Sequence, residues 1–88
     1  MKFEGDEDKS IANSNKHDVS FEEAMKAFLD PNRKIRLNTK HSGVEMRYYC
    51  LGLVGGRVLT VRFTIRGSKV RIIGAGYWRE GRKIYEQE

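Results

Sequence analysis

Arginine and lysine alternate with apolar residues along the second half of this 88-residue chain. Arg62 and Arg66 are four positions apart in the segment RVLTVRFTIRG, and Arg71 follows in KVRIIGAG. Residues four apart on a β-strand share one face and lie about 13 Å from each other, and Arg71 joins them if the strand register allows. Guanidinium groups suit bidentate phosphate contacts, so this pattern favours a polyanionic partner, with nucleic acid first.

The distribution of charge supports the same interpretation. Residues 1–32 carry four Lys and eight Asp or Glu, so their net charge is −4. Residues 33–88 carry thirteen Lys or Arg and four Glu, so their net charge is +9. A basic chain can simply be a soluble protein without a polyanionic partner, but the asymmetry makes a basic binding surface the better interpretation.

Other residues that could do chemistry give weaker signals. The spacing of His17, His41 and Cys50 matches no metal-ligand pattern, and we expect neither a metal nor a cofactor. Gly55-Gly56 fits a hairpin turn, because no phosphate-binding Lys-Ser or Lys-Thr follows it.

Two pairs of neighbouring residues each allow two interpretations. Lys16-His17 lies between two expected helices, where His17 either packs under the turn or transfers protons and binds phosphate. Tyr48 and Tyr49 face opposite sides of one expected strand, so one of them belongs to the core and the other could stack on a base.

The first part of the chain predicts a short edge strand over residues 2–5 and two helices. The acidic run at residues 6–8 suits the first turn of a helix that extends to about Lys16. The second helix follows a capping box formed by Ser20 and Glu23 and ends at Asp30-Pro31. Its expected buried face consists of Phe21, Ala24, Met25, Phe28 and Leu29.

The second part predicts four strands and a closing helix. The strands are expected at 34–38, 46–53, 57–65 and from Val70 onward, and the helix at 78–86. The expected inward positions are Ile35, Leu37, Leu59, Val61, Phe63 and Ile65, and the expected outward ones are Lys34, Arg36, Asn38, Thr60, Arg62, Thr64 and Arg66. The chain is therefore expected to be a single small α+β domain, 1–88, with two N-terminal helices, a twisted antiparallel sheet of about four strands and a C-terminal helix.

Several broad classes of protein are disfavoured. No apolar run approaches the roughly 18 residues of a membrane span, and the polar, acidic N-terminus is unlike a secretory signal. Cys50 is the sole cysteine and fits a reducing compartment, so we expect a cytoplasmic protein. A chain this small buries a modest core, which makes a homodimer or a stabilising partner plausible.

Five segments together resemble the BrnT family of bacterial type II toxins, over nearly the full length of the chain. They are FEGDEDK, KHDVSFEEA, GRVLTVRFTIRG, KVRIIGA and RKIYE. The resemblance implies a RelE-like fold and a ribosome-independent, metal-independent endoribonuclease that cleaves single-stranded RNA and so inhibits translation. It also implies a BrnA-like antitoxin with a ribbon-helix-helix domain, operator DNA contacted only through that antitoxin, and a homodimer or 2:2 complex.

Within this resemblance, each candidate residue receives an expected role. The 2′-hydroxyl of RNA would attack the adjacent phosphate, which requires a base, an acid and cations around the developing charge. Arg66 and Arg71 would hold the phosphate together with the RNA-binding residues Arg62 and Arg79. Lys16, His17 or Glu80 would move protons, and Lys9 would position the substrate.

Two departures from the family pattern leave an alternative open. Gly5 stands where the family usually has Trp, and Gly76 stands where the last strand commonly has Arg. Either Arg79 takes the place of the missing arginine, or the protein is a catalytically weak or inactive module that docks an acidic antitoxin or nucleic acid. A sheet that reads DNA or RNA without any obligate partner is a further alternative.

Overall fold

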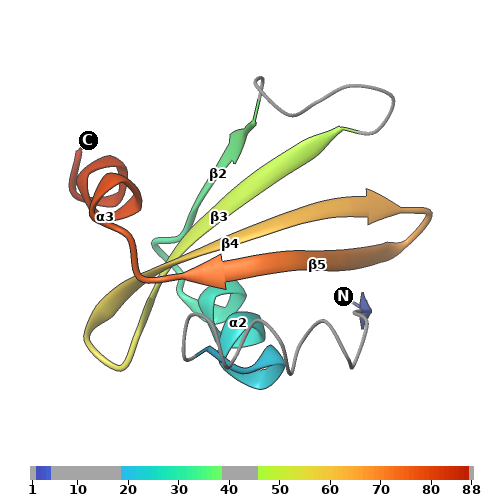
Figure 1. The fold of residues 1–88 in the computed structure, drawn as a ribbon, viewed down its shortest axis with the longest axis horizontal. Helices are drawn as coiled ribbons and strands as arrows, with labels where there is room; N and C mark the ends of the chain where they lie inside the picture. Colours follow the sequence, from blue (N-terminus) through green and yellow to red (C-terminus); the bar gives the residue numbers. More distant parts are fainter. Residues whose placement is uncertain (1, 5–18, 39–45, 88) are drawn as a thin grey trace.

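A single sheet of five strands organises the computed structural model, which describes residues 2–4, 19–38 and 46–87 (Figure 1). The strands lie in the order β1-β5-β4-β3-β2. Along the chain, the elements are β1 (Lys2–Glu4), α2 (Phe21–Lys26), the 3-10 turn η1 (Ala27–Leu29), β2 (Lys34–Leu37), β3 (Arg47–Val54), β4 (Arg57–Arg66), β5 (Lys69–Gly76) and α3 (Arg79–Glu86).

The sheet is mixed, which corrects the expectation of a purely antiparallel one. Strands β2 to β5 form the predicted antiparallel meander, and Gly55 and Gly56 turn β3 into β4 with φ values of 58° and 81°. The predicted N-terminal edge strand is confirmed as β1, but it runs parallel to β5. Pairing between the two distant ends of the chain needs no hairpin, so it leaves no turn signal in the sequence.

Helix α2 begins as predicted. The backbone N–H of Glu23 donates to Ser20 Oγ at 3.1 Å, which satisfies one of the free donors of the first turn. Ala24 and Phe28 are buried, but Leu29 is 77% exposed, so its predicted place in the core is wrong. The chain tightens into a 3-10 turn after Lys26, and this changes the direction in which residue 29 points.

The hydrophobic core lies between the sheet and the α2–η1 segment, on the lower side of the sheet in Figure 1. Phe28 is central to it, with ring centroids 5.0 Å from Phe3 and 5.2 Å from Phe63. The buried members are Val19, Ala24, Ala27, Phe28, Cys50, Leu59, Val61, Phe63, Val70, Ile72 and Ala75. The opposite face of the sheet is not part of this core.

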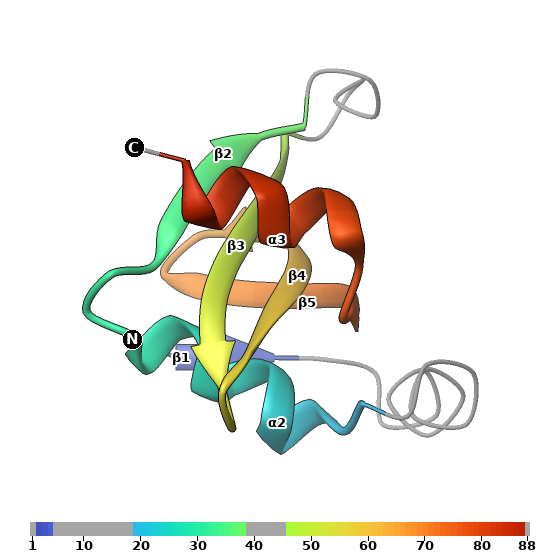
Figure 2. The ribbon, with the colours of Figure 1, turned by 90° about the vertical axis from the view of Figure 1, so that its left-hand side faces the viewer.

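Helix α3 covers part of that opposite face (Figure 2), so a residue can face away from the core, as expected, and still be buried. Thr60 and Thr64 face away from the core, as expected, and both are buried. Thr60 lies under Gly81 of α3, and Thr64 donates its hydroxyl to the carbonyl of Met46 at 2.6 Å. Asn38 is buried as well. Conversely, Ile35, Leu37 and Ile65 lie on the core face as expected but are exposed, because they are near the margins of the sheet where the core layer ends.

Some predictions fall outside the described residues. These are the helix expected from residue 6 to Lys16, the neighbouring Gly5, and the candidate residues Lys9, Lys16 and His17. Within the described ranges, no helix combines the length and apolar character that crossing a membrane would need. The RelE-like assignment of the fold stays a prediction.

Candidate nucleic-acid interface

The sheet face that carries α3 is only partly covered by it, as the two ribbon views show (Figures 1 and 2). Helix α3 lies over Thr60, and the ammonium group of Lys34 donates to the carbonyl of Ile84 at 3.1 Å. Beyond the helix, the same face continues along the strands, and we call this part the open face. Its cationic residues are Arg36, Arg47, Arg62, Arg66, Lys69 and Arg71.

Strand register brings the predicted arginines together on the open face. Arg71 on β5 pairs with Thr64 on β4, and Thr64 lies midway between Arg62 and Arg66. Paired residues on neighbouring strands project to the same side, about 5 Å apart. The alternation in the sequence therefore predicted this surface correctly, and the register adds Arg47, which pairs with Thr64 from the other side.

Arg62 has the most constrained surroundings of these cations. Its guanidinium carbon lies 5.5 Å from the centroid of the Trp78 ring, and a Cβ at Gly74 would stand 2.8 Å from its Nη2. Its Nε is buried and has no hydrogen-bond partner within the described part of the chain. Arg62 is thus partly buried against an aromatic ring and a glycine, while Arg66 is exposed.

Arg66 and Arg71 lie toward the end of the sheet remote from α3. In the strand register, Arg66 lies opposite Lys69 across the β4–β5 turn, and Arg71 lies opposite Glu4 of β1. The ammonium group of Lys69 lies 3.9 Å from the Glu4 carboxylate, an exposed ion pair of small energetic value. The cationic surface therefore extends from Trp78 to the edge of the sheet at β1.

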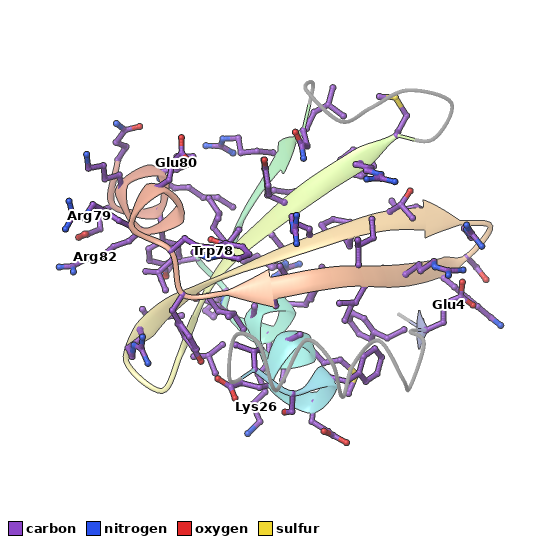
Figure 3. The ribbon with its side chains drawn as sticks, viewed as in Figure 1. Glu4, Lys26, Trp78, Arg79, Glu80 and Arg82 are labelled. Carbon is purple, nitrogen blue, oxygen red and sulfur yellow. The ribbon has the colours of Figure 1, made fainter. Side chains whose placement is uncertain are left out.

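The first turn of α3 sends its two candidate residues to different places (Figure 3). Glu80 lines a cleft of about 420 Å³ together with Arg62 and Tyr49. Arg79 lines another cleft, of about 530 Å³, together with Arg82. The structure therefore places Glu80 and Arg62 on the same cleft, and Arg79 on a different one.

Sequence reasoning missed the part played by Trp78. The indole forms a wall of both clefts and contacts Arg62. A Cβ at Gly76 would stand 2.5 Å from Trp78 Cζ2, so the ring lies directly over that glycine. Nothing in the spacing of these residues could have indicated this contact, because it depends on how the chain turns between β5 and α3.

The tyrosine pair behaves as alternation predicts. Tyr48 stacks on Phe63 in the core, with centroids 5.4 Å apart, and Tyr49 faces the cleft beside Arg62. Cys50 is buried, and burial raises the pKa of its thiol to about 12. Within the described ranges, no three His, Cys, Asp or Glu side chains form a group suited to a metal ion.

Comparison with known proteins gives one match. Residues 6–81 match the model of a family described as the ribonuclease toxin, BrnT, of type II toxin–antitoxin systems. The matched range includes β2 to β5 and the first turn of α3, and so all cations of the open face. No curated protein matches the chain.

Proposed function

The chain belongs to the BrnT family of ribonuclease toxins of type II toxin–antitoxin systems, and we propose that its open face binds single-stranded RNA for endonucleolytic cleavage. One observation carries this proposal: Arg62, Arg71 and Arg66 lie on successive levels of one sheet face. A polyanion that runs along this face would meet a cation at each level. Arginine also offers paired donors that fit phosphate oxygens.

For the chemical step, Arg66 and Arg71 would bind the phosphate that reacts. The neighbouring 2′-hydroxyl loses its proton to a base and attacks phosphorus, which forms a 2′,3′-cyclic phosphate. The bond to the 5′-oxygen breaks, and an acid protonates that oxygen. Fixed guanidinium groups stabilise the negative charge that develops on the phosphate oxygens. This chemistry has no step that requires a metal ion.

The candidates for the acid and the base come from the sequence. Lys16 and His17 are the candidates that lie before α2 in the chain, and His is the side chain that titrates nearest to neutral pH. Glu80 lines the cleft between α3 and the sheet, together with Arg62. Helix α3, which carries Glu80, lies over Thr60, and Thr60 is six residues from Arg66 on β4, which is roughly 20 Å. Glu80 is therefore remote from the phosphate that Arg66 would bind. We therefore assign Lys16 or His17 to proton transfer, and a contact with the RNA to Glu80.

An antitoxin partner follows from the family. We propose that this antitoxin carries a ribbon-helix-helix domain, that it alone contacts operator DNA, and that the complex forms in the cytoplasm as a 2:2 assembly. An antitoxin segment with acidic residues could cover the open face and exclude RNA from it. Inhibition of translation would then follow from RNA cleavage when the antitoxin is lost.

The test is an incubation of the purified chain with single-stranded RNA in the presence of EDTA. We expect fragments that end in 2′,3′-cyclic phosphate and begin with a 5′-hydroxyl, as detected by mass spectrometry. The Arg66→Ala variant, purified in the same way, controls for contaminating nucleases. Cleavage that EDTA abolishes, or cleavage that persists in the variant, would contradict the proposal.

The same experiment addresses the binding-only alternative, which Gly76 favours because the resemblance implies Arg at that position. A chain that binds RNA in a salt-dependent manner and leaves it intact would be an inactive module. Binding is expected to weaken steeply with salt in either case, because cations at the open face release counterions from RNA. Product analysis therefore separates the two functions, whereas affinity does not.

A further inference from the structure

The cleft between α3 and the sheet has the composition of a small-molecule site. It has a volume of about 420 Å³, and Tyr49, Thr60, Arg62, Trp78 and Glu80 are among its lining residues. Sites of this size usually combine aromatic walls with a few polar groups that fix the orientation of the ligand. In this cleft, the walls include the indole and phenol rings beside Leu37, Leu51 and Ile84, and the polar groups include a hydroxyl, a guanidinium, a carboxylate and the carboxamide of Asn38.

Two buried polar atoms at this cleft have no hydrogen-bond partner among the described residues. They are Thr60 Oγ1 and Arg62 Nε, and Thr60 is only 4% exposed. A buried polar atom without a partner costs free energy, so native proteins rarely retain one without a reason. Both atoms belong to residues that line the same cleft. Thr60 Oγ1 lies against Gly81 under α3, so the guanidinium of Arg62, which lies against Trp78, is the group that points to a polar ligand in the cleft.

The walls are suited to a flat aromatic ligand. Trp78 is fixed over Gly76, and the guanidinium of Arg62 lies over the indole. Tyr49 pairs with Arg62 across the β3–β4 ladder, so its ring projects on the same side. Single-stranded RNA is commonly recognised by bases that unstack and lie against aromatic rings or guanidinium planes.

The polar groups distinguish among bases. Arg62 presents N–H donors, which match the O6 and N7 acceptors of guanine. The carboxylate of Glu80 accepts hydrogen bonds, and guanine presents two donors together, N1–H and the 2-amino group. Adenine has an unprotonated N1 at that edge, which a carboxylate repels, and pyrimidines lack N7.

We propose that this cleft is a guanine-binding subsite, which selects the RNA sequence that the open face then cleaves. The inference rests on the proposed function for its biological meaning, but guanine binding itself does not require cleavage. Arg62 lines the cleft, and Arg71 pairs with Thr64, which is two residues, or about 7 Å, farther along β4 than Arg62. A guanine held at Arg62 would place an adjoining phosphate near Arg71, so cleavage is expected next to guanine.

Binding is tested with oligouridine RNAs that carry one internal guanosine, adenosine or inosine, and with GMP and AMP. Trp78 is the only tryptophan in the chain, so its fluorescence reports on the cleft directly. We expect the guanosine RNA to bind at least tenfold more tightly than the adenosine RNA. Inosine lacks the 2-amino group and should bind with intermediate affinity. Equal affinity for all three RNAs would overturn the proposal.

The Glu80→Gln variant assigns the carboxylate its role. It should reduce the preference for guanosine over adenosine, measured by binding, to about threefold or less. Equal loss of cleavage on every RNA, with the preference intact, would mean that Glu80 transfers protons and would overturn its role here. Arg82→Ala, on the far side of α3, is the matched control and should keep the preference.

Failure of this proposal and failure of the ribonuclease proposal give different results. Guanine-selective binding without cleavage would support the subsite and contradict the nuclease. Cleavage at all sequences with equal rates would support the nuclease and contradict the subsite.

Discussion

Gly76 lies directly beneath the indole of Trp78, where a Cβ would stand 2.5 Å from Cζ2 and 2.6 Å from Cε2. A Cβ essentially never lies this close to a non-bonded atom, so any side chain at this position would displace the ring. The resemblance seen in the sequence implies arginine at this position, and in this chain Trp78 occupies the space. Residue 76 is therefore linked to the shape of the cleft and to the position of Arg62, which lies against the same ring.

The first prediction concerns restoration of that arginine. Gly76→Arg should destabilise the protein by about 1–3 kcal/mol, because the added side chain overpacks the contact with Trp78. The emission of this single tryptophan should shift toward longer wavelength as the ring moves into water. Thermal unfolding and fluorescence measure the two effects, and RNA cleavage should fall.

Gly74→Ser provides the matched control on the same strand. The nearest atom to a Cβ at residue 74 would be Arg62 Nη2, at 2.8 Å, and the end of an arginine side chain shifts more easily than the Trp78 ring. Little change in stability is expected. A Gly76→Arg variant that cleaves RNA faster at unchanged stability would contradict the account of this position.

The second prediction concerns Gly81. Glycine has a low helix propensity and so weakens α3, but the absence of a side chain lets the helix pack closely against the sheet. Alanine is usually better than glycine inside a helix by about 1 kcal/mol. A Cβ at residue 81 would stand 1.9 Å from Thr60 Oγ1, however, so Gly81→Ala should destabilise the protein. In a Thr60→Ala background the same change should become neutral or stabilising. A double-mutant cycle from denaturant unfolding measures this coupling, and additive effects would contradict it.

These glycines illustrate what the sequence could and could not predict. Alternation along 57–66 predicted the cationic face, because strand geometry alone decides which residues share a side. The Ser20 cap and the Gly55-Gly56 turn are local signals and were also predicted correctly. The position of α3 depends on contacts between distant residues, such as Gly81 with Thr60 and Trp78 with Gly76, so the cleft and the burial of Thr60 could not be predicted.

The third prediction concerns alkaline pH. The hydroxyl of Tyr77 donates to the carboxylate of Glu23, and burial, followed by this hydrogen bond, raises the pKa of Tyr77 from 10.0 to about 12. A raised pKa in the folded state means that the stabilisation is complete below pH 10 and is lost as pH rises toward 12. The free energy of unfolding should therefore fall over that interval, and less steeply in Tyr77→Phe. Equal slopes for both proteins would contradict this.

The fourth prediction concerns acidic pH and Asp30, which joins three elements. Its Oδ2 accepts from Tyr85 Oη at 2.5 Å and from the backbone N–H of Leu53 at 2.8 Å, while Oδ1 accepts from the N–H of Asn32 at 2.9 Å. The hydrogen bond from Tyr85 is the main reason that the pKa of Asp30 lies below its ordinary value of 3.8.

A lowered pKa means that this stabilisation is present above the ordinary value and is lost as pH falls through the folded value. Asp30→Asn should therefore lower the melting temperature at pH 7. The melting temperature of this variant should also fall less than that of the wild type as the pH is lowered. Tyr85→Phe should have a smaller effect in the same direction, because it removes one of the contacts. A melting temperature of Asp30→Asn equal to the wild type at pH 7 would count against this role.

The most direct test of the central claim compares RNA cleavage by Arg71→Ala and Lys26→Ala. Both variants lose one positive charge, but Arg71 lies on the open face and Lys26 lies on α2, across the sheet (Figure 3). If the open face holds the reacting phosphate, Arg71→Ala should lower the cleavage rate by about 100-fold at unchanged melting temperature, and Lys26→Ala should cleave like the wild type. Equal rates for the two variants would contradict the assignment of RNA cleavage to this face.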